Sequence, residues 1–187
     1  GVSKRVDVER IREAIEVGLT DIGENRVQEA EEKFSLMSDL SVTRHLIGHL
    51  QSNKSKRALE LFSWIQSIDS SSLALRLDRV ASEPTPVLIQ VKLASEGTKA
   101  GAEESDLSNL VETLRSSENL ELRGLMTIPP FFHDSEDVRP YFARLRALAD
   151  EYSLSEISMG MSHDFEIAVE EGATMIRLGT ALFGGRA

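Results

Sequence analysis

The sequence predicts a single (β/α)₈ barrel of the TIM type. Short apolar runs with strand character alternate with amphipathic helical runs along the whole chain, as in βα units that feed a parallel sheet. Eight such alternations fit a closed barrel better than an open sheet. The chain has 187 residues, which is enough for one domain with a sizeable core, whereas barrels of this type typically have about 250.

Seven strands are predicted from apolar runs, and an eighth is a stub at the start of the chain. The expected strands comprise residues 1–4, 19–22, 45–47, 64–68, 87–93, 120–128, 157–159 and 175–178. Only three residues precede Lys4. The first strand is therefore predicted to be truncated on its N-terminal side.

Helical periodicity separates these strands. Apolar residues recur every three or four positions in several segments. They are Val27, Ala30, Phe34 and Met37; Leu73, Leu77, Val80 and Ala81; Leu107, Leu110, Val111 and Leu114; and Tyr141, Phe142, Leu145, Leu148 and Tyr152. Pro140 stands near the start of the last segment, expected over 136–152, where a missing backbone N–H costs least. We find no linker and no second domain.

The composition argues against several classes of function. The net charge of −10 opposes nucleic acid or an anionic membrane as the main partner, because both attract proteins with excess Lys and Arg. The chain has no Cys, which excludes disulfides, thiolate metal sites and Cys nucleophiles. No apolar run approaches the roughly 20 residues that span a bilayer. A soluble, cytoplasmic protein without a signal peptide is expected, and a small anionic ligand is compatible with this charge.

The loops after the last two predicted strands suggest a phosphate site. Arg177, Gly179 and Thr180 end the final strand, and Ser162 follows the strand before it. Phosphate sites after strands seven and eight recur in this fold class. Backbone N–H groups after Gly179, and Ser162 as the N-cap of the next helix, would face the same mouth. The simpler alternative is that Gly179 is a turn residue and Ser162 only a helix cap.

Lys4 ends the first strand, opposite this phosphate site. A lysine there can form a Schiff base with an aldehyde cofactor if its amine is partly desolvated and near another cation. Taken alone, Lys4 is more simply a surface lysine at a frayed terminus. His45 and His49 are four residues apart, but they lie in a strand and the following loop, so no metal site is predicted.

Six sequence motifs run in order along the entire chain. They comprise residues 2–4, 23–29, 45–54, 124–126, 158–166 and 177–184. Together they resemble the pyridoxal phosphate homeostasis protein family, which is similar to the barrel half of alanine racemase. The resemblance implies a non-catalytic protein that binds pyridoxal 5′-phosphate (PLP) and carries or buffers it.

The resemblance also implies which residues bind the cofactor. They are Lys4, Asn25, His45, Met159, Ser162, Arg177, Gly179 and Thr180. Lys4 would be the Schiff-base lysine, and Ser162, Gly179 and Thr180 would hold the phosphate. Arg177 would face the pyridine nitrogen and keep it unprotonated, which weakens the electron sink that many PLP enzymes use. Asn25, His45 and Met159 would line the ring, although His45 is nearly as well explained as a core histidine.

This sequence departs from the family pattern in three places. Residues 5–7 read Arg-Val-Asp where the family usually has a Thr-Lys-Pro-like run, and Arg44 replaces an aromatic residue. Neither change alters an implied ligand. Family members also have a helix and most of a strand ahead of the lysine. We therefore expect residues 1–187 to form one PLP-binding barrel domain that lacks this upstream helix and part of the first strand.

Three functions remain open at this point. The expected one is a monomeric PLP carrier that has apo PLP-dependent enzymes as partners. The second is a PLP-dependent racemase-like enzyme, which needs an acid/base group on the opposite face of the cofactor. Alanine racemase takes this group, a Tyr, from another domain of the partner subunit, whereas Tyr141 and Tyr152 here lie in an outer helix. The third is a phosphate-binding barrel that does not use PLP.

Overall fold

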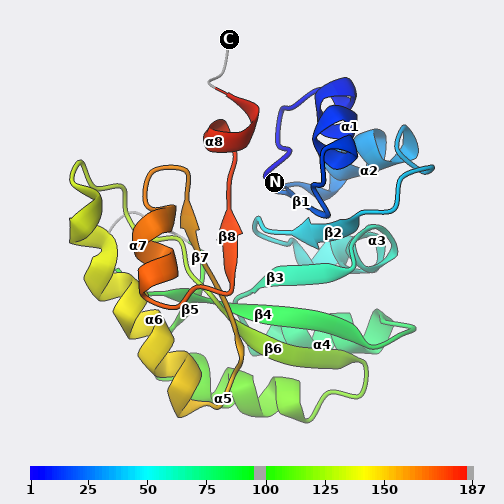
Figure 1. The fold of residues 1–187 in the computed structure, drawn as a ribbon. Helices are drawn as coiled ribbons and strands as arrows, with labels where there is room; N and C mark the ends of the chain where they lie inside the picture. The colour runs from blue at the N-terminus through cyan, green and yellow to red at the C-terminus, as the bar shows by residue number, and fades with distance from the viewer. Residues whose placement is uncertain (95–99, 185–187) are drawn as a thin grey trace.

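Parallel strands form where the sequence predicts apolar runs. In the computed structural model, which describes residues 1–94 and 100–184, the strand order is β1-β2-β3-β4-β6-β7-β8 (Figure 1). The strands are β1 Asp21–Glu24, β2 Thr43–Leu46, β3 Trp64–Ile68, β4 Thr85–Lys92, β6 Leu120–Met126, β7 Glu156–Met161 and β8 Met175–Arg177. Their ends differ from the predicted ones by no more than two residues. A two-residue strand, β5 (Ala102–Glu103), pairs with the end of β4 and was not predicted.

The first residues of the chain close the barrel between β8 and β1. Val2 forms a parallel bridge with Gly23 of β1, and its N–H donates to the carbonyl of Leu178 at 2.7 Å, directly after β8. The N–H of Ser3 donates to the Gly23 carbonyl at 3.0 Å, and the N–H of Gly23 donates to the Gly1 carbonyl at 2.8 Å. Figure 1 shows the N-terminus at this position. The fold is thus the predicted (β/α)₈ barrel, in which residues 1–3 occupy the place of a strand between β8 and β1, and we call these residues the stub.

Helices cover the outside of the barrel (Figure 1). They are α1 Val8–Glu16, α2 Val27–Ser35, α3 Ser55–Leu61, α4 Ser71–Val80, α5 Glu104–Arg115, α6 Arg139–Glu151, α7 Phe165–Glu170 and α8 Thr180–Phe183, with 3₁₀ turns η1 Ser52–Lys54 and η2 Ser135–Val138. The predicted periodic positions face inward: Phe34, Leu77, Leu110 and Phe142 are all buried. Pro140 stands at the start of α6, as predicted. In the part of the chain that the structure describes, no helix has the length and apolar character needed to cross a membrane.

Strands β6 and β7 approach each other very closely at one glycine. Gly124 pairs in register with Glu156. A Cβ placed on Gly124 would lie 1.8 Å from the carbonyl oxygen of Glu156, which no side chain tolerates. The absence of a side chain at position 124 therefore allows this part of the barrel wall to form.

Candidate functional site

Lys4 lies on the turn that follows the stub, at the carboxyl-terminal ends of the barrel strands. Its side chain is half-buried, and the next residue, Arg5, has φ of 59°, in the left-handed region that non-glycine residues seldom adopt. The stub also touches the loop after β8, since a Cβ on Gly179 would lie 3.7 Å from the Cβ of Val2. The structure thus brings the Lys4 turn next to the loop that carries Gly179.

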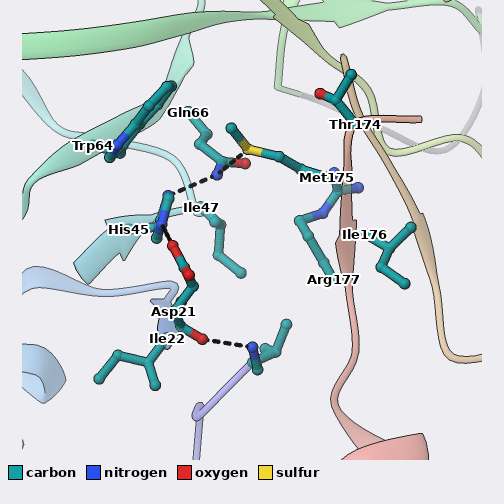
Figure 2. Close-up of a pocket in the computed structure, with 13 residues that line it drawn as sticks. Asp21, Ile22, His45, Ile47, Trp64, Gln66, Thr174, Met175, Ile176 and Arg177 are labelled. Atoms are coloured by element: carbon teal, nitrogen blue, oxygen red, sulfur yellow. Dashed lines mark hydrogen bonds and ion pairs between the residues drawn. The ribbon is translucent and has the colours of Figure 1, made fainter. Parts of the chain in front are cut away.

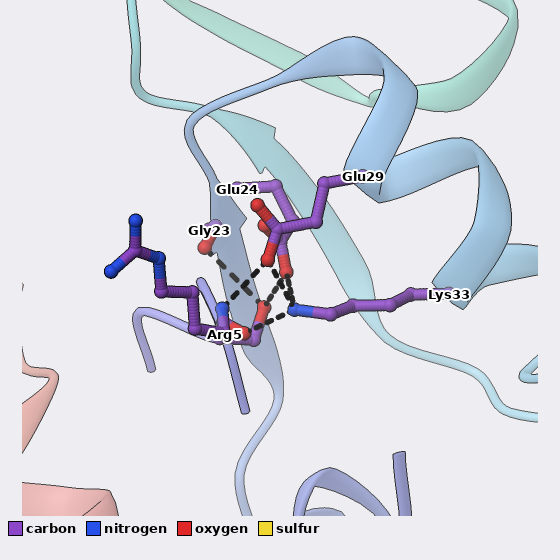
Figure 3. A network of polar contacts seen from close by, with 6 residues as sticks. Arg5, Gly23, Glu24, Glu29 and Lys33 are labelled. Atoms are coloured by element: carbon purple, nitrogen blue, oxygen red, sulfur yellow. Dashed lines mark hydrogen bonds and ion pairs between the residues drawn. The ribbon is translucent and has the colours of Figure 1, made fainter. Parts of the chain in front are cut away.

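A network of charged side chains holds the Lys4 turn (Figure 3). The ammonium of Lys33 donates to the Ser3 carbonyl at 2.5 Å, to Glu24 Oε1 at 2.8 Å and to Glu29 Oε1 at 2.9 Å. The hydroxyl of Ser3 donates to Glu24 Oε1 at 2.8 Å, and the backbone N–H of Arg5 donates to Glu29 Oε1 at 2.6 Å. We call Glu24, Glu29 and Lys33 the clamp. It fixes the backbone on both sides of Lys4.

Glu24 is the most deeply buried member of the clamp. Its side chain is fully buried, and its Oε2 atom has no hydrogen-bond partner among the described residues. Burial raises the pKa of the Glu24 carboxyl, and the contact with Lys33 opposes that rise. Glu24 lies at the end of β1 and faces the ammonium of Lys33. Sequence reasoning missed Lys33, for which the i, i+4 spacing from Glu29 was the available signal.

Ser162 and the start of α8 form a second part of the site. The Ser162 hydroxyl oxygen accepts hydrogen bonds from the N–H of Gly179 at 3.2 Å and from the N–H of Ala181 at 3.0 Å. Two backbone donors that converge on one oxygen suit an anionic oxygen equally well. Thr180, between them, is exposed and therefore accessible to a ligand. The loops after β7 and β8 thus meet, as the sequence predicted.

Ser162 does not cap the next helix, which corrects one prediction. Helix α7 begins at Phe165, and its N-cap residue is Asp164. The Asp164 carboxylate accepts the N–H of Met161 at 2.6 Å, which tightens the turn after β7. Ser162 is therefore free to point toward α8.

A chain of polar side chains crosses the barrel interior, and Figure 2 shows its part from Gln66 through His45 to Asp21. Arg177 Nη1 donates to the hydroxyl of Ser158 at 2.8 Å, and this hydroxyl donates to Gln66 Oε1 at 2.7 Å. Gln66 Nε2 lies 3.0 Å from His45 Nδ1, and His45 Nε2 lies 2.8 Å from Asp21 Oδ1. We call these five residues the interior chain. It connects β8 to β1 through β7, β3 and β2.

Arg177 is a buried cation without a carboxylate partner. Its side chain donates to the Thr127 carbonyl at 2.8 Å as well as to Ser158, and within residues 1–94 and 100–184 it forms no ion pair. Burial lowers the pKa of the Arg177 guanidinium to about 10, and the charge of Asp164 opposes this shift. Arg177 therefore remains protonated at neutral pH.

His45 lies at the other end of the interior chain and favours its neutral form. Burial lowers the pKa of the His45 imidazole, while Asp21 acts in the opposite direction. Its ring stacks on Trp64 with 5.7 Å between the centroids. His45, Gln66 and Arg177 line a cavity of about 400 Å³. This cavity extends toward the amino-terminal ends of β1, β3 and β8, whereas Lys4 and Ser162 lie at the opposite ends of the strands.

The structure places the remaining predicted residues in different surroundings. Asn25 follows β1 and lies beside Gly48, where a Cβ would come within 2.3 Å of the Asn25 carbonyl oxygen. Met159 is fully buried in the hydrophobic core cluster. Side chains alternate along a strand, so Met159 points away from the interior that its neighbour Ser158 faces. The structure therefore does not bring the Met159 side chain to the other predicted residues.

Sequence reasoning missed three members of the interior chain. Asp21, Gln66 and Ser158 are polar residues at positions within or beside apolar strand runs. Gln66 and Ser158 are nearly or fully buried, and buried polar side chains require partners. Polar residues at inward-facing strand positions were thus a usable signal.

Comparison with known proteins identifies the relatives of this chain. Residues 3–187 match the family model described as alanine racemase, N-terminal domain. The pyridoxal phosphate homeostasis protein of Aquifex aeolicus (strain VF5) is 46% identical over 195 residues, which cover 100% of this chain and 86% of that protein. The protein of the same name from Escherichia coli (strain K12) is 41% identical, with 99% of this chain and 84% of that protein covered.

Solved structures agree with these sequence relatives. PipY of Synechococcus elongatus PCC7942, solved with PLP bound, is 43% identical with a TM-score of 0.93, and the match covers 98% of this chain and 91% of that chain. Alanine racemase from Corynebacterium glutamicum shares the fold, with 19% identity, a TM-score of 0.74 and coverage of 98% of this chain and 54% of that chain. The chain therefore belongs to the alanine racemase N-terminal domain family and, within it, to the pyridoxal phosphate homeostasis proteins.

Proposed function

We propose that this protein binds PLP covalently on Lys4 at the carboxyl-terminal mouth of the barrel and serves as a carrier of the cofactor. The observation that carries the proposal is the convergence of the Lys4 turn with the loop after β8. The clamp fixes the backbone around Lys4, and in the adjoining loop the N–H groups of Gly179 and Ala181 converge on the hydroxyl oxygen of Ser162. PipY, a relative solved with PLP bound, supports the same ligand.

Each part of the mouth has a chemical counterpart in PLP. Lys4 would condense with the aldehyde and release one water, while Lys33 is unsuited to this role because its ammonium already has three oxygen acceptors. Ser162, Gly179 and Thr180 would hold the phosphate through hydroxyl and backbone donors. When bound, PLP supplies an electrophilic carbon and an electron-withdrawing ring.

The pyridine ring would extend toward the barrel interior. Arg177, as a buried cation, would face the ring nitrogen and oppose its protonation. Asn25 and His45 would line the ring from β1 and β2. Met159 is included only through its backbone, because its side chain packs in the core.

Two observations favour a carrier over a racemase-like enzyme. A cationic neighbour at the ring nitrogen weakens the electron sink that stabilises an amino-acid carbanion. The two tyrosines of the chain lie on the outer helix layer, Tyr141 within α6 beside Phe132 and Tyr152 at the end of α6. Neither is placed for proton transfer at the mouth. We therefore propose a monomeric, non-catalytic, cytoplasmic carrier that supplies apo PLP-dependent enzymes.

The direct test is an absorbance spectrum of the purified protein with PLP, before and after reduction with borohydride. We expect a visible band from bound cofactor and, after reduction, a modified peptide that contains Lys4. Lys4→Ala should lose the band and stay folded, whereas the control Lys92→Ala should keep it. Cofactor fixed to Lys54, to Lys92 or to Lys99, which lies outside the described residues, would refute the assignment.

A second variant tests the orientation of the ring. Arg177→Gln should shift the visible band and its pH dependence while PLP remains bound, because the phosphate contacts after β7 and β8 are unchanged. A spectrum identical to that of the unmodified protein would place the ring nitrogen away from Arg177.

A further inference from the structure

Only one arrangement of protons fits the hydrogen bonds of the interior chain. Arg177 can only donate, so the Ser158 oxygen accepts from it. The Ser158 proton then goes to Gln66 Oε1, and the amide nitrogen of Gln66 must face His45 Nδ1. His45 Nδ1 therefore accepts, and Nε2 carries the proton that is donated to Asp21. The contacts thus specify a neutral His45 in one tautomer.

We infer that Gln66 and Ser158 are positioning residues that couple the protonation state of His45 to the hydrogen bonding of Arg177. In its relation to PLP this inference rests on the proposed function, because Arg177 would face the pyridine nitrogen. The coupling itself depends only on residues of the chain. It can therefore be measured in the protein without cofactor.

Protonation of His45 disrupts the pattern at a defined point. An added proton on Nδ1 would face the amide nitrogen of Gln66, so that one donor would oppose another. Rotation of the amide by half a turn restores that contact by presenting Oε1 to Nδ1. The Gln66 nitrogen then faces the Ser158 hydroxyl, so the Ser158 proton loses its acceptor. Arg177 still donates to the hydroxyl oxygen of Ser158. Protonation of His45 thus changes the hydrogen-bond partners of the Ser158 hydroxyl, which accepts from Arg177.

Charged and titratable groups surround the interior chain on several elements. Asp21 on β1 contacts His45, the α-amino group of Gly1 on the stub lowers the pKa of His45, Arg177 lies on β8, and Asp164 precedes α7. Asp21 favours the imidazolium, whereas the α-amino group of Gly1 disfavours it. Of these groups only Asp21 contacts the His45 ring, so among residues 1–94 and 100–184 Gln66 is the polar partner through which the hydrogen bonds reach Arg177.

The test is a ¹⁵N and ¹H NMR titration of the His45 ring in the full chain without PLP. We expect the unmodified protein to show the Nε2–H tautomer. Ser158→Ala should raise the pKa of His45 by about half a unit, because the Gln66 amide becomes free to rotate and accept the new proton. Gln66→Glu should raise it by more than about one unit, because a carboxylate then accepts from Nδ1.

Ser67→Ala is the matched control. Ser67 is as buried as Ser158 and neighbours Gln66 on β3, but its hydroxyl donates to the Gly48 carbonyl outside the interior chain. This variant should shift the His45 pKa by less than about 0.2 unit. In a Gln66→Leu background, Ser158→Ala should no longer shift His45, as in a double-mutant cycle.

The outcomes separate this inference from the proposed function. An Nδ1–H tautomer, or equal shifts from Ser158→Ala and Ser67→Ala, would overturn the coupling whether or not PLP binds. If the coupling holds and PLP binds, Ser158→Ala should alter the pH dependence of the visible band in the direction seen for Arg177→Gln. A protein that shows the NMR coupling but no visible band with PLP would refute the proposed function and leave the coupling intact.

Discussion

Arg177 keeps its charge inside the barrel by hydrogen bonds to neutral oxygens. The Ser158 hydroxyl and the Thr127 carbonyl accept from its two terminal nitrogens. A carboxylate in their place would neutralise the guanidinium and remove its influence on a neighbouring ring. A cation held without a counter-ion instead makes it unfavourable to place a second positive charge nearby. At the scale of a single residue, this supports the proposal that Arg177 faces an unprotonated pyridine nitrogen.

The phosphate contacts can be tested by removing two hydroxyls. Ser162→Ala combined with Thr180→Val should weaken PLP binding, because each hydroxyl contact to a charged acceptor contributes on the order of 1.5 to 3 kcal/mol. The loss of both contacts corresponds to a rise in Kd of about a hundredfold or more, measurable by equilibrium dialysis. Ser67→Ala is the control and should leave Kd unchanged. Equal affinity in the double variant would locate the phosphate elsewhere.

At the scale of elements, the stub and α2 act together. The stub contributes Ser3, and α2 contributes Glu29 and Lys33, which reach back to the turn that carries Lys4. Glu24 on β1 lies between them and is fully buried. An ion pair at this depth fixes geometry, and the loss of one member leaves the other charge uncompensated.

Lys33→Met should destabilise the protein by about 3 kcal/mol or more at pH 8, because the Glu24 carboxylate is left without its cation. The pKa of Glu24 is already raised by burial, and loss of Lys33 raises it further. A carboxyl whose pKa is raised in the folded state binds more protons there than in the unfolded state. The free energy of unfolding therefore falls as the pH rises above the pKa that this carboxyl has in the unfolded state. The deficit of Lys33→Met should thus be smaller at pH 5 than at pH 8, as measured by urea denaturation.

Lys92→Met provides the comparison for that variant. Lys92 pairs with Glu103, whose side chain is 57% exposed. An exposed pair contributes little, so this change should cost less than about 1 kcal/mol and show no comparable dependence on pH. Similar losses in both variants would mean that the clamp has no special energetic role.

The contact between β6 and β7 gives an element-scale prediction about stability. Gly124→Ala forces a methyl group against the Glu156 carbonyl, so the strands must separate, and the free energy of unfolding should fall by about 3 kcal/mol or more. Gly18→Ala is the control, since Gly18 has φ of 113° but no atom within 4 Å of a Cβ. It should lose only about 1 to 2 kcal/mol from backbone strain. Thermal denaturation of both variants distinguishes a steric clash between strands from backbone strain alone.

The sequence predicted the barrel well because both periodicities are local. Each apolar run that was expected to be a strand contains one, and the helical positions of α2 and α5 are buried. The contacts that build the site are not local. Ser158 and Gln66 are 92 positions apart, and their hydrogen bond depends on the register of β3 and β7 around a closed barrel. Motif resemblance indicated residues such as Lys4 and Ser162, whereas Gln66 and Lys33 required the three-dimensional structure.

At the scale of the whole molecule, the carrier proposal requires one barrel both to hold a reactive aldehyde and to release it. An open mouth would leave a lysine-linked cofactor accessible to water and amines, so slow release is compatible with the carrier proposal. A racemase instead needs two proton-transfer groups on opposite faces of the ring. Among the described residues near the mouth, Lys4 is placed for proton transfer on one face of the ring.

The protein with PLP should therefore not exchange amino-acid α-protons. In deuterated buffer, alanine should incorporate deuterium no faster than with free PLP, as followed by ¹H NMR. The same preparation should transfer PLP to an apo PLP-dependent enzyme, which would regain activity. Sustained α-proton exchange that disappears in Lys4→Ala would contradict the carrier proposal and favour the racemase-like alternative.

The closure of the barrel by the stub also affects where the barrel wall opens locally. Among the described residues, the stub shares one backbone hydrogen bond with the end of β8, from the N–H of Val2 to the carbonyl of Leu178, whereas β4 and β6 share six register pairs. Segments with few backbone pairings open locally at low free energy, so this seam is where hydrogen exchange should be fastest in the barrel wall. Lys4 follows one side of the seam, and Gly179 lies on the other. A cofactor bound to Lys4 and to the loop at Gly179 would cross-link the two sides of the seam. Binding of PLP would therefore slow hydrogen exchange there, and its release would restore the faster exchange.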